Sequence, residues 1–326
     1  MASLLIGRLL QAQPIGEPIE LSEIYRTGDT VMSVRLLGAL TLAGKSVDGL
    51  KVRDLSDVAW DEDEQLLYAV SDDGNLIHLR PSFTDGLLRN ADLVAAHRLK
   101  DDAGNRLPDE AADAEGLEIL NGRNGERGDT QLIVAFDGQA RIVRYRADGT
   151  LIGAYPLPKQ LHDAEVSKGG DIALQAIAAH PKLGLIIAPE EPTVSPDLFT
   201  LYGFNGGRWH FQPLDPEHST LVGLEIGPGG SLLILERNYV NIFKPVVFAV
   251  RKLEVNPRQT SGGNASVKDI FVLSTAEDWA LDNFEGLARH RADRYFMVSD
   301  DERNPFQRTL LVYFEVLIES DSNITH

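Results

Sequence analysis

Short apolar runs separated by polar turns make up most of this sequence. Five runs are almost continuously apolar: LLYAV (66–70), QLIVAF (131–136), LGLIIA (183–188), SLLILE (231–236) and RYFMVS (294–299). Runs of this length, bounded by turn residues, are typical of β-strands buried on both faces. Residues 157–170 and the stretch around Leu281 each have room for one short helix. The pattern therefore predicts an all-β protein.

The strand pattern repeats five times along the chain. Each unit has an apolar strand, a turn, a very apolar strand, an acidic turn and then further strands. The units cover residues 54–99, 114–158, 174–214, 221–274 and 282–316. Repeated groups of four short strands are typical of a β-propeller.

The last unit has only three strands, and the segment SVRLLGALTL (33–42) has no partner near it in the sequence. We predict that this N-terminal strand pairs with residues 308–316. The pairing would close a single five-bladed β-propeller and remove two exposed sheet edges. The expected division is an N-terminal extension (1–32), a propeller domain (33–317) and a C-terminal tail (318–326).

Two alternative folds stay open at this point. A sixth blade would exist if the long segments around 85–110 or 253–268 belonged to a further unit. Two stacked β-sandwiches would also accommodate many short strands.

Carboxylates gather where the predicted strands begin and end. In an antiparallel blade, the start of the first strand and the end of the second lie at the same end of the sheet. The start positions are Ser56, Glu115, Gln175, Val222 and Glu285. The end positions are Asp72, Asp73, Asp137, Glu190, Glu191, Glu236, Arg237, Asp300 and Asp301. We therefore predict that one mouth of the propeller carries a ring of carboxylates with one arginine.

Converging carboxylates repel one another unless a cation, arginines or protons neutralise them. Carboxylate oxygens in a flexible arrangement suit Ca²⁺. The arginines that could pair with them instead are Arg141, Arg237, Arg303 and Arg308. Alternatively, these acidic residues are ordinary turn residues that are solvated or cap local amides.

Composition narrows the classes of partner. The 326 residues carry a formal net charge of −18, which argues against non-specific binding to nucleic acid or anionic membranes. The chain has no cysteine, so disulfides, thiolate catalysis and cysteine-based zinc sites are excluded. No apolar run approaches the ~20 residues of a membrane span. The first residues, MASLLIGRLLQAQ, form no convincing signal peptide. The oligomeric state is not indicated by the sequence.

Several segments resemble the phytase-like family of bacterial proteins, which is described by an esterase-like activity of phytase. They are DAEGLE (113–118), RYRADGTLIGAYPLP (144–158), LVGLEIGPGGSLLILERN (221–238), and DNFEGLA with VSDDERNPFQRTLLVYFEV (282–288 and 298–316). The resemblance implies a propeller-type fold and a hydrolase activity on phosphate or other esters. It also implies a periplasmic or secreted protein, while a cytoplasmic location stays open because no signal is visible.

The sequence departs from the family pattern in three places. Gln175 and Ala176 stand where the family tends to have a Glu-Gly pair, and Asp137 stands where a glutamate is usual. In the first unit, LSDVAWD keeps Ser56 of the family stretch but not its glycines. The carboxylate ring is therefore expected to be incomplete in the third unit.

The residues and the resemblance together give the hypothesis of a metal-assisted ester or phosphoester hydrolase with Ca²⁺ as cofactor and a small anionic or ester substrate. The catalytic residues would be Glu115, Glu285, Arg237 and Arg308. Substrate-binding residues would be Arg141, Arg303 and Glu236. Metal ligands would be Asp72, Asp137, Glu190, Asp300 and Asp301. The alternatives are a non-catalytic propeller that binds a ligand or a protein, and a purely structural role for the carboxylates and arginines.

Overall fold

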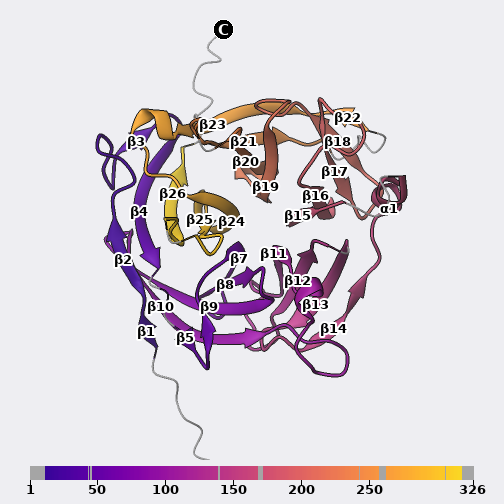
Figure 1. Cartoon of the computed structure of the whole chain (residues 1–326), viewed down its shortest axis with the longest axis horizontal. Helices are drawn as coiled ribbons and strands as arrows, with labels where there is room; N and C mark the ends of the chain where they lie inside the picture. The colour runs from indigo at the N-terminus through magenta and orange to yellow at the C-terminus, as the bar shows by residue number, and fades with distance from the viewer. Residues whose placement is uncertain are drawn as a thin grey trace, which may run out of the picture.

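Five antiparallel sheets are arranged in a ring around one axis (Figure 1). This computed structural model describes residues 12–42, 44, 46–138, 140–167, 172–241, 243–256, 262–304 and 306–317. The prediction of a five-bladed β-propeller is confirmed, and the stacked-sandwich alternative is wrong.

Each blade has four main strands, counted outward from the axis. The inner strands are β7 (Leu55–Asp61), β11 (Ala114–Leu120), β15 (Leu174–His180), β19 (Ser219–Ile226) and β24 (Asn283–Arg291). The second strands are β8 (Leu66–Ser71), β12 (Gln131–Phe136), β16 (Gly184–Pro189), β20 (Leu232–Asn238) and β25 (Arg294–Asp300). The third strands are β9 (Asn75–Thr84), β13 (Arg141–Arg146), β17 (Phe199–Gly203), β21 (Val247–Glu254) and β26 (Leu310–Val316). The outer strands are β10 (Leu87–Arg98), β14 (Leu151–Tyr155), β18 (Arg208–Phe211), β23 (Ser266–Ser274) and β4 (Val34–Leu42).

The two long segments that left a sixth blade open belong to the five blades. Residues 87–98 form β10 of blade 1, and residues 266–274 form β23 of blade 4. The six-blade alternative is therefore wrong.

The N-terminal strand closes the ring. β4 pairs antiparallel with β26, with Leu40 opposite Leu311 and Arg35 opposite Glu315. In Figure 1 the indigo β4 lies beside the yellow β26. Two earlier strands continue this edge, because β2 (Gly16–Ile19) pairs with β4 and β1 (Gln13–Pro14) pairs with β10. The predicted closure is confirmed, and the segment before β4 links the outer edges of blades 5 and 1.

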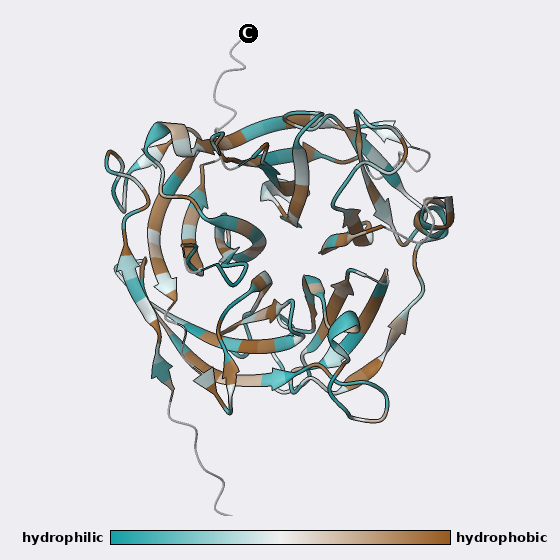
Figure 2. Cartoon of the chain, in the orientation of Figure 1, coloured by the Kyte–Doolittle hydropathy of each residue, from teal (hydrophilic) through white to brown (hydrophobic). Residues whose placement is uncertain are grey.

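The second strands are apolar because they are covered on both faces. Every residue of β8 is buried, as are five of the six residues of β12. Five hydrophobic clusters fill the core, one between each pair of neighbouring blades. Figure 2 shows hydrophobic residues along most strands of the ring. The continuous apolar runs of the sequence thus follow from blade stacking rather than from one deep core.

Helices are few. α1 (Lys159–Ser167) lies between blades 2 and 3, as residues 157–170 predicted. Near the second expected helix, a single 3₁₀ turn spans Thr275–Glu277, and Leu281 itself lies in an irregular segment. The other 3₁₀ turns and short strands are Asp109–Ala111, Pro228–Gly230, β3 (Thr30–Val31), β5 (Ser46–Val47), β6 (Leu50–Lys51) and β22 (Gly263–Asn264). None of the described helices is long and apolar enough to cross a membrane.

Candidate functional site

A β-bulge occurs near the start of every inner strand. The pairing of β11 with β12 jumps from Ala114 to Gly116, which leaves Glu115 without a partner. The same jump occurs in the other four blades. The bulge residues are Ser56, Glu115, Gln175, Val222 and Glu285. A bulge re-aims the side chain of its extra residue. The five start positions read from the sequence are therefore placed by one repeated backbone irregularity, at the end of the ring that we call the mouth.

Small residues follow four of the five bulges because the inner strands of neighbouring blades approach closely. A Cβ added at Gly286 would lie 2.7 Å from Asp57 Cα, and one at Gly223 would lie 3.1 Å from the carbonyl oxygen of Glu285. Glycine permits such backbone contacts, whereas a side chain obstructs them. The Glu-Gly pairs of the sequence thus combine a bulge that re-aims a carboxylate with a glycine that lets the ring close.

In blade 1 the residue after the bulge is an aspartate that bridges three blades. Asp57 Oδ2 accepts a hydrogen bond from the Leu117 amide over 2.7 Å, and Oδ1 accepts one from the Leu287 amide over 3.2 Å. Burial raises the pKa of Asp57 well above its usual value despite these bonds. Asp57 therefore ties the inner strands of blades 2 and 5 to that of blade 1.

Glu115 belongs to a cluster of three carboxylates. Oxygens of Asp72, Asp113 and Glu115 all lie within 4.8 Å of one another. Neutral donors contact two of these groups: Ser56 Oγ donates to Asp72 over 2.7 Å, and Gln175 Nε2 donates to Glu115 over 3.0 Å. We call Asp72, Asp113 and Glu115 the blade 1–2 cluster.

A second cluster contains Asp54, Asp300 and Asp301. Here arginines supply positive charge, because Arg53 Nε and Arg303 Nε lie 2.8 Å and 3.0 Å from Asp54 Oδ2. Burial raises the pKa of Asp54, but the contacts with Asp301, Arg53 and Arg303 outweigh it, and the pKa is lowered overall. The second cluster is thus partly neutralised by the protein itself.

Glu285 lies at the centre of a third set of contacts. Its Oε1 accepts hydrogen bonds from Arg237 Nη1 over 3.0 Å and from Asn283 Nδ2 over 2.7 Å. Asn283 also contacts Glu302 over 3.0 Å, and Arg237 Nη2 lies 3.5 Å from Glu190 Oε1. Arg237 therefore joins blades 3, 4 and 5 at the mouth.

The mouth carboxylates raise one another's pKa values. Burial is the largest cause at each group, and it raises the pKa of Glu285 to about 8 and that of Asp300 to about 7. The pKa of Asp72 rises to about 6 for the same reason, with Asp113 adding to it. For Glu115 the pKa is well above its usual value, through burial and then repulsion from Glu285 and Asp72. These couplings place Glu115, Glu285, Asp72 and Asp300 in one shared electrostatic space.

The blade 1–2 cluster fits a hard cation. Ligand oxygens at ~2.3–2.6 Å from Ca²⁺ lie up to about 5 Å apart, which matches three carboxylates within 4.8 Å. All three pKa values are raised, primarily by burial, so the cluster carries repulsion that a cation would relieve. Both clusters could hold an ion, and their contacts do not identify which ion.

One sequence-predicted residue lies away from the mouth. Glu236 Oε1 is 2.6 Å from Arg251 Nη1, and its Oε2 accepts the Leu214 amide over 2.8 Å. Its side chain is fully buried. Neighbouring residues of a strand point to opposite faces, so Arg237 reaches the mouth and Glu236 points between blades. The expectation that Glu236 shares the mouth is therefore corrected.

The remaining predicted residues lie near the mouth but are already engaged. Arg308 pairs with Asp282 over 2.7 Å, and Arg141 stacks on Phe136 with its guanidinium carbon 3.9 Å from the ring centre. Arg303 contacts Asp54 and Asp73 and is 58% exposed at its side chain. Asp137 raises the pKa of Asp113 and of Glu190, in both cases after burial.

Sequence reasoning missed three polar residues of the mouth: Asp54, Asp113 and Asn283. Each precedes a bulge residue by two positions. Aligning the five units on their bulge positions would have grouped them, but the bulges themselves are invisible without strand pairing.

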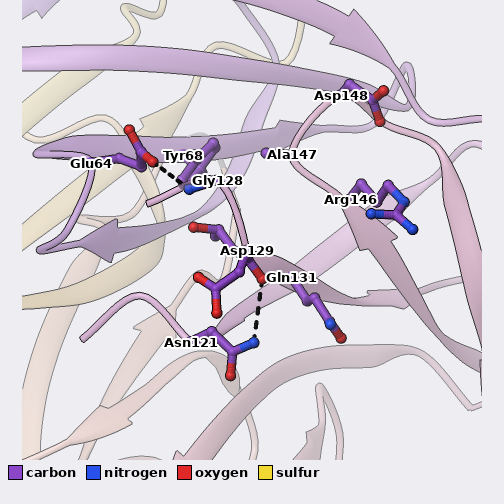
Figure 3. A pocket seen from close by; sticks show the side chains of 10 residues that line it. Glu64, Tyr68, Asn121, Gly128, Asp129, Gln131, Arg146, Ala147 and Asp148 are labelled. Carbon is purple, nitrogen blue, oxygen red and sulfur yellow. Dashed lines mark hydrogen bonds between the residues drawn. The ribbon is translucent and has the colours of Figure 1, made fainter. Parts of the chain in front are cut away.

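Cavities also occur outside the mouth. One of about 490 Å³ is lined by residues of blades 1 and 2, among them Glu64, Tyr68, Asn121, Asp129 and Arg146 (Figure 3). A second of about 500 Å³ is lined by the far halves of the inner strands, including Glu118 and Glu225. No mouth carboxylate lines either cavity, so neither belongs to the predicted site.

Comparisons with known proteins point to a family. A family model described as "Phytase-like: Esterase-like activity of phytase" matches residues 51–303. No curated protein matches the chain. Among solved structures, the chain is similar to Chaetomium thermophilum Raptor, with 13% identity, TM-score 0.37, and coverage of 94% of this chain and 28% of Raptor. It is also similar to the Neurospora crassa Pan2 WD40 domain, with 10% identity, TM-score 0.34, and coverage of 82% and 90%. At these scores neither structural likeness bears on activity.

Proposed function

Because this chain belongs to the phytase-like family, we propose that it hydrolyses esters or phosphoesters with the help of a metal ion at the mouth of the propeller. The observation that carries this proposal is the blade 1–2 cluster, three carboxylates within 4.8 Å of one another. They lie in the same electrostatic space as Glu285, whose pKa is raised to about 8 by burial above all. A cation site beside a carboxyl group that titrates near neutrality is what metal-assisted hydrolysis requires.

In this proposal Asp72, Asp113 and Glu115 hold the ion, and Ca²⁺ is the favoured identity. The ligands are hard oxygens on two segments, Asp72 after β8 and both Asp113 and Glu115 at the start of β11, which suits a cation of flexible geometry. When bound, such an ion polarises a phosphoryl or carbonyl oxygen and lowers the pKa of a coordinated water. Gln175 keeps Glu115 in place through its 3.0 Å hydrogen bond.

Glu285 is proposed as the proton-transfer residue. A group with a pKa of about 8 is a competent proton donor to a leaving oxygen at neutral pH. Arg237 and Asn283 fix its Oε1, so Oε2 remains the atom available to a substrate. The role of Arg237 is thus to position Glu285 rather than to bind substrate.

Arg303 is proposed as the contact for an anionic substrate group. It is the most exposed of the mouth arginines with a described ion pair, at 58%, and it stands beside the second cluster. Arg308 is held by Asp282 and by the carbonyl of Ala280, which favours a positioning role for it.

Export from the cytoplasm is also proposed, on the strength of the family. A site with only three protein carboxylates suits the millimolar calcium of extracellular compartments better than cytosolic levels. Cell fractionation of the natural host tests this location.

The experiment combines thermal melts with turnover assays on the full chain. Melts are recorded with calcium and with a chelator, and turnover is measured on a phosphomonoester and a short-chain carboxyl ester. We expect calcium to raise the melting temperature and Glu285→Gln to abolish turnover. Glu277→Gln, at an exposed position on a 3₁₀ turn, is the matched control and should change neither.

Each other outcome selects an alternative. If calcium raises the melting temperature but neither ester is hydrolysed, the result favours a non-catalytic propeller that binds a ligand or a protein. If calcium does not change the melting temperature and neither ester is hydrolysed, the result favours a purely structural role for the carboxylates and arginines.

A further inference from the structure

A cavity of about 600 Å³ opens between blades 4 and 5 at the mouth end. Its polar lining includes Arg237, Asn283 and Glu302, which also contact one another or Glu285. Its lining also includes Tyr239, Phe248, Asp282 and Phe306. Because Arg237 lines the cavity and also contacts Glu285, the cavity adjoins the proposed catalytic site.

Three aromatic side chains line this cavity. Phe248 is buried, while Tyr239 is 48% exposed and Phe306 is 92% exposed. A phenylalanine ring left almost wholly in water loses favourable burial, so it gains when a ligand covers it. Tyr239 and Phe306 thus provide exposed aromatic surface of the kind that an apolar ligand group requires.

The charges of the lining disfavour a polyanion. Arg237 already contacts Glu285, Glu190 and Asn283, and Asp282 is paired with Arg308. Glu302 adds a further negative charge. The lining thus offers no unengaged positive charge to a second or third phosphate, and the net charge of the chain, −18, opposes such groups as well.

We propose that this cavity is a subsite for the alcohol part of the substrate, and that this part is aromatic or bulky and apolar. The proposal rests on the hydrolase function above and narrows it to monoesters of apolar alcohols, in contrast to polyphosphorylated cyclitols. Hydrolysis breaks the bond between the acyl or phosphoryl group and the alcohol oxygen. Water supplies the hydroxyl to the acid product, the alcohol takes a proton from Glu285 as it leaves into the cavity, and the remaining proton of that water restores the proton on Glu285.

The test compares esters whose alcohols have similar basicity but different size. Naphthylmethyl and ethyl alcohols form one pair, each as its acetate and as its phosphate. We expect kcat/KM for the naphthylmethyl ester to exceed that for the ethyl ester by about tenfold or more, with most of the difference in KM. Equal values for both esters, or faster turnover of inositol hexakisphosphate than of naphthylmethyl phosphate, would overturn the proposal.

Two phenylalanines form a matched pair of variants. Phe306→Ala removes an exposed ring that lines the cavity, and Phe243→Ala removes a ring that is 88% exposed and does not line it. Neither ring is buried, so neither change should impair folding. We expect Phe306→Ala to lower the naphthylmethyl-to-ethyl ratio by about threefold or more and Phe243→Ala to leave it at the wild-type value. An equal effect of both variants would contradict the assignment.

A binding measurement separates the subsite from the hydrolase function. Calorimetric titration of the protein with naphthylmethanol measures binding and requires no turnover. Binding that weakens in Phe306→Ala but not in Phe243→Ala supports the subsite even if no ester is hydrolysed. Absence of binding, or binding that is unchanged in Phe306→Ala, overturns the subsite whatever the activity.

Discussion

Arg237 Nη1 lies 3.0 Å from Glu285 Oε1, yet the pKa of Glu285 is raised to about 8. Burial is the largest cause, and the charges of Asp300 and Asp72 add to it, so these effects outweigh the stabilising arginine. A carboxyl group that faces an arginine and still favours its proton marks a site with an excess of negative charge. This excess is the physical reason to expect both pH-dependent stability and cation binding.

Without calcium, the melting temperature should fall as pH rises from about 6.5 to about 8. The folded-state pKa values of Asp300 and Glu285, about 7 and about 8, lie above their unfolded values. The folded state therefore holds protons that the unfolded state has lost, and this contribution to stability disappears as pH rises through the folded pKa values. We expect a fall of about 2–4 °C in thermal melts with a chelator.

His78 and His290 act in the opposite direction but outside this window. Burial lowers their pKa values to about 4 and about 3, so they destabilise the fold only below about pH 6.5. Glu285→Gln should flatten the fall, and the exposed Glu277→Gln should not. A melting temperature that stays constant across the window would show that the mouth carboxylates are already ionised in the native state.

Calcium should raise the melting temperature through the blade 1–2 cluster. A ligand that binds only the native state stabilises it in proportion to the logarithm of its concentration. We expect Asp113→Asn to weaken the calcium response by about tenfold or more in concentration. The control is Asp109→Asn, which changes a side chain that is 85% exposed four residues earlier.

The second cluster is the competing candidate for the calcium site. Arg53 and Arg303 already pair with Asp54 there, so Asp301→Asn should leave the calcium response intact. Loss of the response in Asp301→Asn and its retention in Asp113→Asn would move the ion to the second cluster.

Removal of residues 1–42 should abolish cooperative folding. β4 supplies Leu37, Leu40 and Leu42 to the cluster between blades 5 and 1, and its loss would expose the edge of β26. Circular dichroism and calorimetry should then show no single sharp transition. As a milder change, Leu40→Ala should keep the transition and lower the free energy of unfolding by about 2–5 kcal/mol. A truncated chain that melts like the full one would mean that the ring does not need this strand.

The fold could be predicted from the sequence because its main signal is local and repeated. Each buried second strand is a continuous apolar run, and the missing fourth strand of the last unit pointed to β4. The site could be predicted only in part. A one-residue difference along β20 decides whether a side chain faces the mouth or a neighbouring blade, and it separates Arg237 from Glu236. Register of this kind depends on strand pairing, which a single sequence does not contain.

The bulges were the second feature outside the reach of sequence. Glu115 and Glu285 reach the mouth because one extra residue enters each inner strand, a property of the pairing between strands. The glycines after them were visible as Glu-Gly pairs, but their cause, the backbone of the adjacent blade, was not. The contact between Gly286 and Asp57 therefore offers a direct test of how the mouth is built.

Gly286→Ala should destabilise the protein although alanine is a better strand residue than glycine. The new Cβ would lie 2.7 Å from Asp57 Cα, which requires the inner strands of blades 5 and 1 to separate. It would also lie 2.7 Å from Val298 Cγ1 on the neighbouring strand β25. We expect the free energy of unfolding to fall by about 1–3 kcal/mol in denaturant titrations. The matched control is Gly153→Ala on β14, where no atom lies within 4 Å of the added carbon and no loss is expected. Since Asp57 accepts the amides of Leu117 and Leu287, separation of these strands should also disturb the bulge that carries Glu285. Equal unfolding free energies for both alanine variants would show that the structure can accommodate a methyl group at this contact. Close packing would then not explain why position 286 is a glycine.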